Sequence, residues 1–255
     1  MAAPAGCVLN ECDPLRTIVA GRELLPAGGD APRHRHLHPS AIAEITGQFD
    51  QVGYAGRVRV AAGELLVQPT LDAHANRMSP GRGAQILRLA WPDIDDLGGV
   101  YQLGDLDAVV RAAERDPRAA AELAHAQCAA QPPRRPAGDL PDLLAAQLAG
   151  GAVASLAGWA GQRGVARETV SRAFAAAFGV PARRFRAELR ARAAWLQIVR
   201  TGDRLAEIAA ATGFADQAHM TRDVRALTGA SPARWRCDPR VRGFRRAPRG
   251  HFASR

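Results

Sequence analysis

A segment in the C-terminal half of this chain occurs twice in tandem. Five residues of the first copy return 49 residues later, and after a slip of one residue at a turn five more return 50 residues later. The matched pairs are Leu156 with Leu205, Trp159 with Ile208, Ala160 with Ala209, Gly164 with Gly213, Val165 with Phe214, Val170 with Met220, Arg172 with Arg222, Phe174 with Val224, Gly179 with Gly229 and Phe185 with Trp235. A fixed spacing of this kind indicates two copies of one supersecondary unit.

The second copy begins with a short helix that ends at a glycine turn. Asp203 is predicted to cap this helix, because its side chain is a good acceptor for a free backbone N–H. Leu205, Ile208 and Ala209 follow at helical spacing and form one apolar stripe. Gly213 then lies where a helix ends in the left-handed conformation, so the chain is expected to turn there.

A second helix follows that turn in the same copy. Asp216 is its predicted cap, and Met220 and Val224 belong to its buried face. Gly229 ends it, and Ser231–Pro232 starts another helix by the rule of a cap followed by proline. Two short helices joined by a turn that contains glycine are a helix-turn-helix motif.

The first copy follows the same plan. Ser155 caps a helix over Leu156–Arg163, Gly164 makes the turn, and Arg167–Phe178 is the second helix. Ala166 occupies the cap position of that second helix, so its start is less well defined than in the other copy.

One continuous helix is predicted between the two copies, over Pro181–Val199. Its length is about 30 Å at ~1.5 Å per residue. Successive major grooves on one face of DNA lie about 34 Å apart. A rigid helix of this length suits two motifs that enter adjacent major grooves.

The charge of the chain is unevenly distributed. All 34 basic residues are Arg; residues 1–140 hold 14 Arg and 17 acids, a net of −3, and residues 141–255 hold 20 Arg and 8 acids, a net of +12. A basic half joined to a slightly acidic half indicates that the basic half meets a polyanion. The basic half lacks an amphipathic anchor helix with Trp or Phe on one face, so nucleic acid is favoured over a membrane surface.

The second helix of each copy carries polar residues on the face that the core does not take. Arg pairs bidentately with guanine, Gln pairs with adenine, and Ser or Thr contacts bases or phosphates. The candidate DNA-binding residues are Arg167, Glu168, Ser171 and Arg172 in the first copy and Gln217, Ala218, His219, Thr221 and Arg222 in the second. His219 is equally compatible with a surface position that makes no contact.

Other residues of this half have different expected roles. Six arginines are placed better for phosphate contacts, which position a protein without specifying sequence: Arg183, Arg184, Arg186, Arg225, Arg234 and Arg236. Six aromatic residues are assigned to the core rather than to base stacking: Trp159, Phe174, Phe178, Trp195, Phe214 and Trp235.

Ser155–Arg236 resembles the two-motif DNA-binding domain of the AraC/XylS transcriptional regulators. The match is densest in IAAATGFADQAHMTRDV and in LTGASPARWR, which together lie within Ile208–Arg236. Ala166 replaces the usual Ser cap and Val224 replaces an aromatic residue, but neither change removes a DNA-facing group. The resemblance implies base and phosphate contacts on both recognition helices, here through Arg172, Gln217, His219, Thr221 and Arg222.

The first hundred residues read as short strands, and evenly spaced short strands favour a sandwich or a barrel. The expected strands are Arg16–Ala20, Arg57–Val60, Glu64–Gln68 and Gln85–Ala90. From Asp105 to Ala130 the chain is rich in Ala, Arg and Glu, which favours helices. Gln131–Pro141 holds four prolines and a glycine and is expected to be an interdomain linker.

The predicted fold is therefore of the α+β class, with an N-terminal cupin-like β-barrel followed by an all-α domain with two helix-turn-helix motifs. We expect a cupin-like sensing domain at 1–104, a helical connection and linker at 105–140, the DNA-binding domain at 141–237 and a loose basic tail at 238–255. The cupin-like part is what the family resemblance implies.

Two partial cupin motifs agree with it. The first fits Gly28, His34, His36 and Gly47, with Ser40 in place of its Glu. The second fits Gly63, Pro69 and His74, with Leu71 and Met78 in place of a Gly and an Asn.

Three of these residues, His34, His36 and His74, could bind a divalent metal, because imidazole suits Zn, Fe, Ni or Cu. The missing carboxylate leaves the site one ligand short and argues against an oxygenase, although Glu44 and His38 lie near enough in sequence to substitute. The alternative is a barrel mouth that binds an organic effector, or nothing.

The function predicted from these features is sequence-specific binding of double-stranded DNA by a transcription regulator, with no enzymatic activity. A small-molecule effector in the barrel would change how the DNA-binding parts are oriented or how two chains pair, and a homodimer is plausible. The competing hypothesis is a metal-dependent cupin enzyme or metal sensor with a basic helical appendage. The operator, the effector and the sign of regulation do not follow from the sequence.

The sequence also indicates a cytoplasmic location. It holds no run of about 20 apolar residues, and Met1–Glu11 lacks the basic flank and apolar run of a secretory signal. Four cysteines, Cys7, Cys12, Cys128 and Cys237, lack CxxC spacing and are expected to be reduced thiols.

Overall fold

The computed structural model describes residues 20–81, 83–91, 98–129, 131–134 and 138–244. The chain divides into two compact units, Met1–Pro181 and Ala182–Arg255, which are described separately. In the described residues, each helix is too short or too polar to cross a lipid bilayer.

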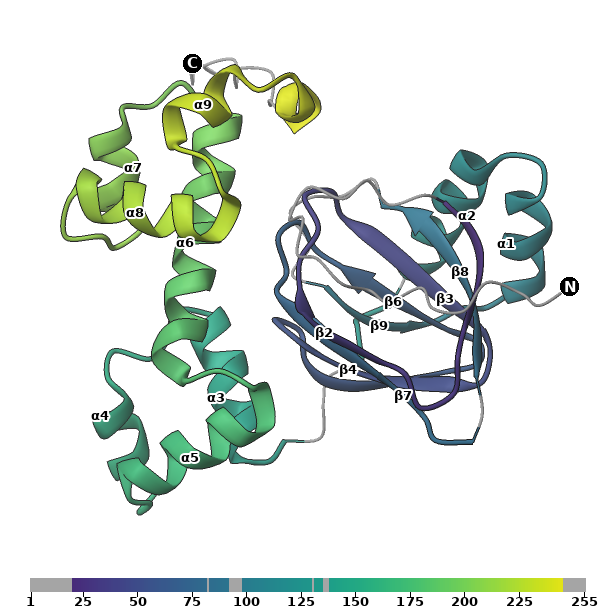
Figure 1. Ribbon diagram of the computed structural model, residues 1–255, viewed down its shortest axis with the longest axis horizontal. Helices are drawn as coiled ribbons and strands as arrows, with labels where there is room; N and C mark the ends of the chain where they lie inside the picture. The colour runs from purple at the N-terminus through teal and green to yellow at the C-terminus, as the bar shows by residue number, and fades with distance from the viewer. Residues whose placement is uncertain (1–19, 82, 92–97, 130, 135–137, 245–255) are drawn as a thin grey trace, which may run out of the picture. The chain divides into compact units, whose positions relative to one another are not determined.

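Within the described residues, the first unit opens with nine antiparallel strands in two sheets (Figure 1). The five-stranded sheet has the order β1-β8-β3-β6-β9 and the four-stranded sheet has the order β2-β7-β4-β5. The strands are β1 (Gly21–Leu25), β2 (Asp30–His34), β3 (Ser40–Thr46), β4 (Gln48–Gly53), β5 (Gly56–Ala61), β6 (Glu64–Gln68), β7 (His74–Met78), β8 (Ala84–Ala90) and β9 (Gly99–Gln102). We call these strands and their turns the β domain.

The alternation of side chains along the strands creates two apolar layers. Ile42, Phe49 and Leu66, from strands of both sheets, belong to one buried cluster that fills the inside of the β domain. Ala41 and Ala43 face the other way and pack with residues of α1 (Leu106–Ala113) and α2 (Pro117–Ala129). These two helices therefore cover the outer face of the five-stranded sheet.

The helices of the C-terminal half have bounds close to those expected. In the first unit they are α3 (Leu140–Ala149), α4 (Leu156–Gly161) and α5 (Arg167–Phe178). In the second unit they are α6 (Ala182–Arg200), α7 (Leu205–Ala211), α8 (Gln217–Thr228) and α9 (Pro232–Cys237), followed by the 3-10 helix η1 (Pro239–Phe244). The order of a two-sheet β region before a helical region confirms the predicted fold class.

Several expected elements differ from the structure. The strand expected at Arg16–Ala20 lies almost entirely outside the described residues. Three expected strands correspond to β5, β6 and β8, but the other six were not predicted. Polar residues that face the interior break the alternation in β4 and β7, and Pro32 lies in β2, at an edge of its sheet where a missing N–H is tolerated.

The linker and the tail also carry more structure than expected. Arg134 donates its backbone N–H to the carbonyl of Val100 at 2.7 Å, and Leu140–Pro141 already belong to α3, with Asp139 as its cap. The expectation of a loose tail from Asp238 onward is wrong as far as Phe244, because η1 forms there and Val241 is buried. The rest of the tail lies outside the described residues, and the domain boundaries remain predictions.

Candidate nucleic-acid interface and histidine cluster

The first helix-turn-helix motif is built by local hydrogen bonds and one glycine turn. Ser155 caps α4, its Oγ accepting the backbone N–H of Gly158 at 3.0 Å. Gly164 has φ +64°, a backbone conformation that favours glycine, and it turns the chain into α5. Trp159 is 5% exposed, so this aromatic residue of the motif is buried as predicted.

Helix α5 presents the predicted polar face to solvent. Val170, Phe174 and Phe178 are buried, whereas Arg167, Glu168 and Arg172 are exposed and Ser171 is half-buried. The Nε of Arg167 donates to the Glu168 carboxylate at 3.1 Å. A hydrogen bond with its own backbone N–H, and then the guanidinium of Arg167, lowers the pKa of Glu168.

The second motif repeats this construction with a stronger cap. Asp216 Oδ1 accepts the backbone N–H of His219 at 2.6 Å, and Gly213 turns the chain with φ +75°. Arg204, rather than the predicted Asp203, precedes α7, because Glu207 returns to accept the backbone N–H of Arg204 at 3.2 Å. In the first motif, by contrast, Ala166 offers α5 no side-chain cap, as the sequence indicated.

Helix α8 also exposes the predicted residues. Gln217, Ala218 and Arg222 are exposed, and Thr221 and His219 are half-buried. The helix is held from the other side by apolar residues, of which Met220 and Val224 are fully buried. All six aromatic residues assigned to the core are buried, at 6% exposure or less.

His219 differs from its neighbours because its ring contacts other side chains. Its Nε2 lies 3.4 Å from Nη2 of Arg190 and 3.5 Å from Oδ2 of Asp223. Its ring meets the Phe214 ring edge-to-face, with the centroids 5.2 Å apart. The sequence patterns did not single out Arg190 or Asp223, because neither stands at a matched position of the repeat.

The arginines predicted to contact phosphate are exposed with one exception. Arg184 donates to Glu188 at 3.1 Å, one helical turn further along α6. Arg236 is half-buried and donates to the backbone carbonyl of Asp203. The exposed members of the set are Arg183, Arg184, Arg186, Arg225 and Arg234.

The three predicted metal ligands come together in the β domain. One nitrogen from each of His34, His36 and His74 lies within 4.8 Å of the other two. Nδ1 of His34 lies 2.7 Å from the carbonyl of Pro32, and Nδ1 of His74 lies 3.1 Å from the carbonyl of Asp72. Donation to these carbonyls leaves Nε2 of both rings as the metal-binding nitrogen, which is how metal-ligating histidines are commonly oriented.

Burial keeps the deepest of these histidines uncharged. His74 is 1% exposed, and its desolvation, followed by the charges of His34 and His36, holds its pKa well below the usual value. A neutral imidazole is the form that binds a metal. The cluster is therefore chemically suited to a soft or borderline divalent ion.

A buried amide network surrounds His74. Gln68 donates its Nε2 to Oε1 of Gln51 at 2.6 Å and lies 3.0 Å from Nε2 of His74, while Ser40 donates to Oε1 of Gln68 at 3.1 Å. A metal on His74 would displace the amide of Gln68. The sequence motifs located the histidines and Ser40 but gave no sign of Gln51 or Gln68.

Glu44 lies apart from this cluster, although the sequence left it open as a substitute ligand. Its side chain is fully buried, and neither carboxylate oxygen has a hydrogen-bond partner. Desolvation raises its pKa from the usual 4.5 to about 8. In the described residues, the group of potential ligands contains neither Glu44 nor His38.

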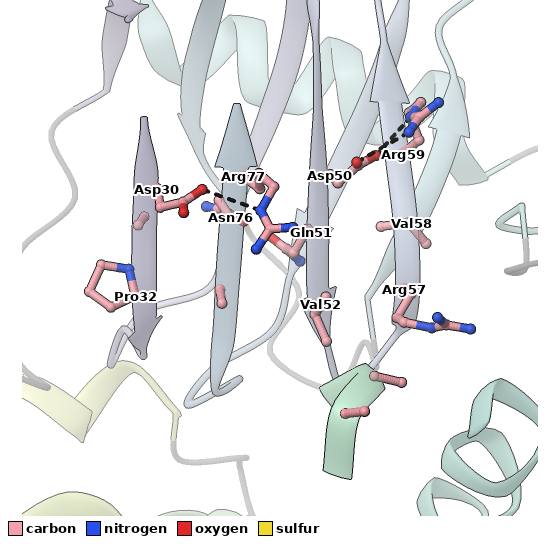
Figure 2. Close-up of a pocket in the computed structure, with 14 residues that line it drawn as sticks. Asp30, Pro32, Asp50, Gln51, Val52, Arg57, Val58, Arg59, Asn76 and Arg77 are labelled. Atoms are coloured by element: carbon pink, nitrogen blue, oxygen red, sulfur yellow. Dashed lines mark hydrogen bonds and ion pairs between the residues drawn. The ribbon is translucent and has the colours of Figure 1, made fainter. Parts of the chain in front are cut away.

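A pocket of about 660 Å³ lies over the outer face of the four-stranded sheet (Figure 2). Two ion pairs line it, Arg77 with Asp30 at 3.4 Å and Arg59 with Asp50 at 2.7 Å. Its lining is Asp30, Ala31, Pro32, Asp50, Gln51, Val52, Arg57, Val58, Arg59, Ala75, Asn76, Arg77, Ala176 and Ala177.

Arg57 joins β5 to the start of α3. Its guanidinium forms two hydrogen bonds with the Asp142 carboxylate, at 3.0 and 2.9 Å, and a third with Asp139. The Asp142 side chain is 6% exposed, so this ion pair is largely protected from solvent. The hydrogen bond to Asp142 raises the pKa of Arg57, which therefore stays charged.

One family model and several solved structures are similar to parts of this chain. Residues 159–237 match the model of a family described as a helix-turn-helix domain. A transcriptional regulator with an AraC-type DNA-binding domain from Chromobacterium violaceum is 24% identical over 34% of this chain and 77% of its own, with a TM-score of 0.31. No match was found among curated proteins.

Two further solved structures are similar to this chain. The C-terminal domain of AraT, a response regulator from Geobacillus stearothermophilus, is 17% identical over 39% of this chain and 85% of its own, with a TM-score of 0.37. ToxT from Vibrio cholerae, with an unsaturated fatty acid bound, is 10% identical over 85% of this chain and 94% of its own, with a TM-score of 0.38.

The match over residues 159–237 spans both motifs, from Trp159 in α4 to Cys237 at the end of α9. Residues 159–237 therefore match a helix-turn-helix domain, and such a domain supports the role of a DNA-binding transcription regulator.

Proposed function

We propose that this protein is a sequence-specific transcription regulator that reads double-stranded DNA with α5 and α8 and responds to an effector held by the β domain. The observation that carries the proposal is a duplicated polar face: two helices, each following a glycine turn, expose arginine and other base-pairing side chains in the half of the chain with the large positive charge. A regulator that binds DNA acts where the DNA is, so we place it in the cytoplasm.

The residues proposed to contact DNA on α5 and α8 are the nine predicted from the sequence. Arg172 and Arg222 have the geometry for bidentate pairing with guanine, and Gln217 for pairing with adenine. Ser171 and Thr221 are suited to bases or phosphates, and the apolar Ala218 to a thymine methyl group. The set is Arg167, Glu168, Ser171, Arg172, Gln217, Ala218, His219, Thr221 and Arg222.

The proposal includes two adjacent major grooves. Helix α6, which joins the two motifs in sequence, has 19 residues. At ~1.5 Å per residue such a helix is about 28 Å long, close to the spacing of about 34 Å between grooves on one face of DNA. A binding site that contains two half-sites about one helical turn apart follows from this proposal.

The proposed function is tested by DNA binding across a salt series. Purified full-length protein is titrated with its own upstream DNA and with random competitor, and log Kd is plotted against log salt concentration. We expect a preference for the upstream DNA and a steep salt dependence, because released counterions drive the phosphate contacts. We expect Arg222→Ala to weaken binding to the preferred DNA about 5- to 150-fold, which corresponds to the 1–3 kcal/mol of one bidentate base contact.

A matched control isolates the role of position from the role of charge. Arg118→Ala also removes one positive charge, but from α2, where Arg118 is 87% exposed and paired with Glu122. This variant is expected to bind both DNAs as the unaltered protein does. Equal affinity of the unaltered protein for upstream and random DNA would refute sequence-specific reading.

For the effector, the histidine cluster favours a divalent metal ion. His34, His36 and His74 would hold the ion, and each ring would bind through a neutral nitrogen. The three ring nitrogens, which lie within 4.8 Å of one another, would supply three ligands to such an ion. A metal sensor is therefore the second candidate function.

Metal binding and the regulatory response are measured separately. Equilibrium dialysis with Zn²⁺ or Ni²⁺ is expected to give one ion per chain, and His74→Ala is expected to abolish it. Unchanged stoichiometry in His74→Ala would rule out this cluster as the metal site. A small organic effector is the alternative, and its candidate site is the pocket over the four-stranded sheet. Pairing of two chains is a separate question, and a dimer would be detected by sedimentation.

A further inference from the structure

Arg190, on α6, contacts both the turn and the recognition helix of the second motif. Its Nη1 donates to the carbonyl of Gly213 at 3.2 Å, and its Nη2 donates to Oδ2 of Asp223 at 3.3 Å. Gly213 precedes α8, whereas Asp223 lies in the middle of it. One guanidinium therefore holds both the turn that precedes the recognition helix and the helix itself.

Two rings complete this arrangement. The guanidinium carbon of Arg190 lies 4.2 Å from the centre of the Phe214 ring, which is 6% exposed. Phe214 in turn meets the ring of His219 edge-to-face, and His219 Nε2 lies 3.4 Å from Arg190 Nη2. Cation–π contacts of Arg strengthen when they are shielded from water, and the Arg190 side chain is only 27% exposed.

We infer that Arg190 is a positioning residue for base reading: together with Asp223 and His219 it fixes the rotation of α8 about its own axis, and so determines which side chains of α8 reach the bases. This inference rests on the proposed function of α8 as a recognition helix. In this arrangement His219, besides its proposed DNA contact, supports Arg190 and Asp223. Gln217, Ala218 and Arg222 are the fully exposed members of the proposed DNA-contacting set on α8.

The geometry of a helix explains why rotation matters. With side chains, a helix has a radius of about 5–6 Å, so a rotation of about 10° moves a side-chain tip by about 1 Å. A hydrogen bond to a base edge tolerates a range of only about 0.5 Å in distance. A small loss of rotational control would therefore remove direct base contacts while leaving the charge of the helix unchanged.

The first motif lacks these contacts, so they are not a general property of the repeat. At the spacings of 49 and 50 residues, Phe214 corresponds to Val165, His219 to Thr169 and Asp223 to Ala173. None of these three residues can supply a ring or a carboxylate to an arginine. The contacts of Arg190 therefore belong to the second motif alone among the two copies.

Lysine cannot replace this arginine. A guanidinium is planar, donates in two directions at once and stacks on an aromatic ring, whereas an ammonium is a compact, strongly hydrated charge. Arg190→Lys keeps the positive charge of α6 but cannot hold Gly213, Asp223 and Phe214 together. This substitution separates the effect of geometry from the effect of charge.

The test begins with selection of bound sequences from a random DNA library by the unaltered full-length protein. Affinities for the selected sequence and for random DNA are then measured for Arg190→Ala, Arg190→Lys and Asp223→Asn, with helix content and thermal midpoint recorded for each. We expect Arg190→Lys to keep its affinity for random DNA and to lose tenfold or more of its preference for the selected sequence. Asp223→Asn is expected to lose part of that preference.

Arg184→Ala is the charge-matched control on the same helix. Arg184 is 61% exposed and forms its ion pair with Glu188 of the same helix. Its loss is expected to lower both affinities together and to leave their ratio unchanged. If Arg190→Ala does not fold, Arg190→Lys and Asp223→Asn decide the outcome.

The outcomes distinguish this inference from the function on which it rests. If the unaltered protein enriches a sequence and Arg190→Lys retains the same preference for it, the positioning role is refuted and the proposed function stands. If the unaltered protein enriches no sequence, sequence-specific reading is refuted, and the inference falls with it.

Discussion

The buried carboxyl of Glu44 makes the β domain less stable as the pH rises. In the folded state its pKa is about 8, against a usual value of 4.5, because the group is desolvated and neither oxygen has a hydrogen-bond partner. The folded chain therefore holds a proton that the unfolded chain releases above pH 4.5. The stability is fully present below pH 4.5 and is lost as the pH rises through about 8.

The size of the effect follows from the two pKa values. At 1.36 kcal/mol per pH unit, holding the proton costs about 3 kcal/mol of stability at pH 7 and about 4 kcal/mol at pH 8. Glu44→Gln replaces the carboxyl by a neutral group of nearly the same shape. Its stability relative to the unaltered protein is therefore expected to rise by about 3 to 4 kcal/mol between pH 5 and pH 8.

Hydrogen exchange of the peptide that covers β3, which contains Glu44, measures this difference in the full-length protein. Exchange rates at each pH are corrected for the intrinsic chemistry and converted to opening free energies. Glu122→Gln, at an exposed glutamate of α2, serves as the control and is expected to change stability little at either pH. A Glu44→Gln variant whose relative stability stays constant from pH 5 to pH 8 would refute an uncharged, desolvated Glu44.

Three further predictions concern other residues. His74 titrates in the opposite sense: because burial depresses its pKa, the stability it contributes is present above about pH 6.5 and is lost as the pH falls, so His74→Gln is expected to flatten the acid side of the same exchange profile. Arg57→Ala leaves the buried Asp142 carboxylate unpaired and is expected to destabilise the start of α3 by about 2–3 kcal/mol, less than a fully buried pair because Arg57 is 33% exposed; protection of α3 unchanged from the unaltered protein would contradict this. Ala166→Ser supplies the cap that α5 lacks and is expected to raise thermal stability by about 1 kcal/mol, whereas Asp216→Ala is expected to lower it by a similar amount, both measured by calorimetry.

The helical half was predictable because its signals are local. A cap, a stripe of apolar residues and a glycine each act within a few residues. Because the motif is duplicated, the elements predicted in one copy could be compared with those in the other. Ser155, Asp216 and Ser231 all cap helices as expected, and Gly179 and Gly229 end theirs in the left-handed conformation. The exception is Asp203: α7 begins one residue later than expected, after Arg204, whose backbone N–H donates to Glu207.

The β domain was less predictable because its interior is partly polar. Gln51, Gln68 and His74 point inward and satisfy one another, so their strands lack the alternation that marks a half-buried strand. The histidines were found through the spacing of two short motifs, not through strand prediction. Glu44 was considered only as a ligand, since nothing in its neighbours along the chain indicates complete burial.

The recognition helices illustrate why base-reading residues and the residues that position them differ in predictability. A base-reading residue must face solvent, so its place follows from the helical period and the buried face of its own helix. A positioning residue is defined by what it contacts: Arg190 is 23 residues from Gly213 and 33 from Asp223 along the chain. From the helical period alone, Arg190 cannot be told apart from Arg184, which has the same charge on the same helix. Only the contacts that Arg190 makes in the folded protein distinguish the two. A substitution survey that treated all arginines of this basic half as phosphate contacts would therefore misassign the residue whose loss is expected to change specificity rather than affinity.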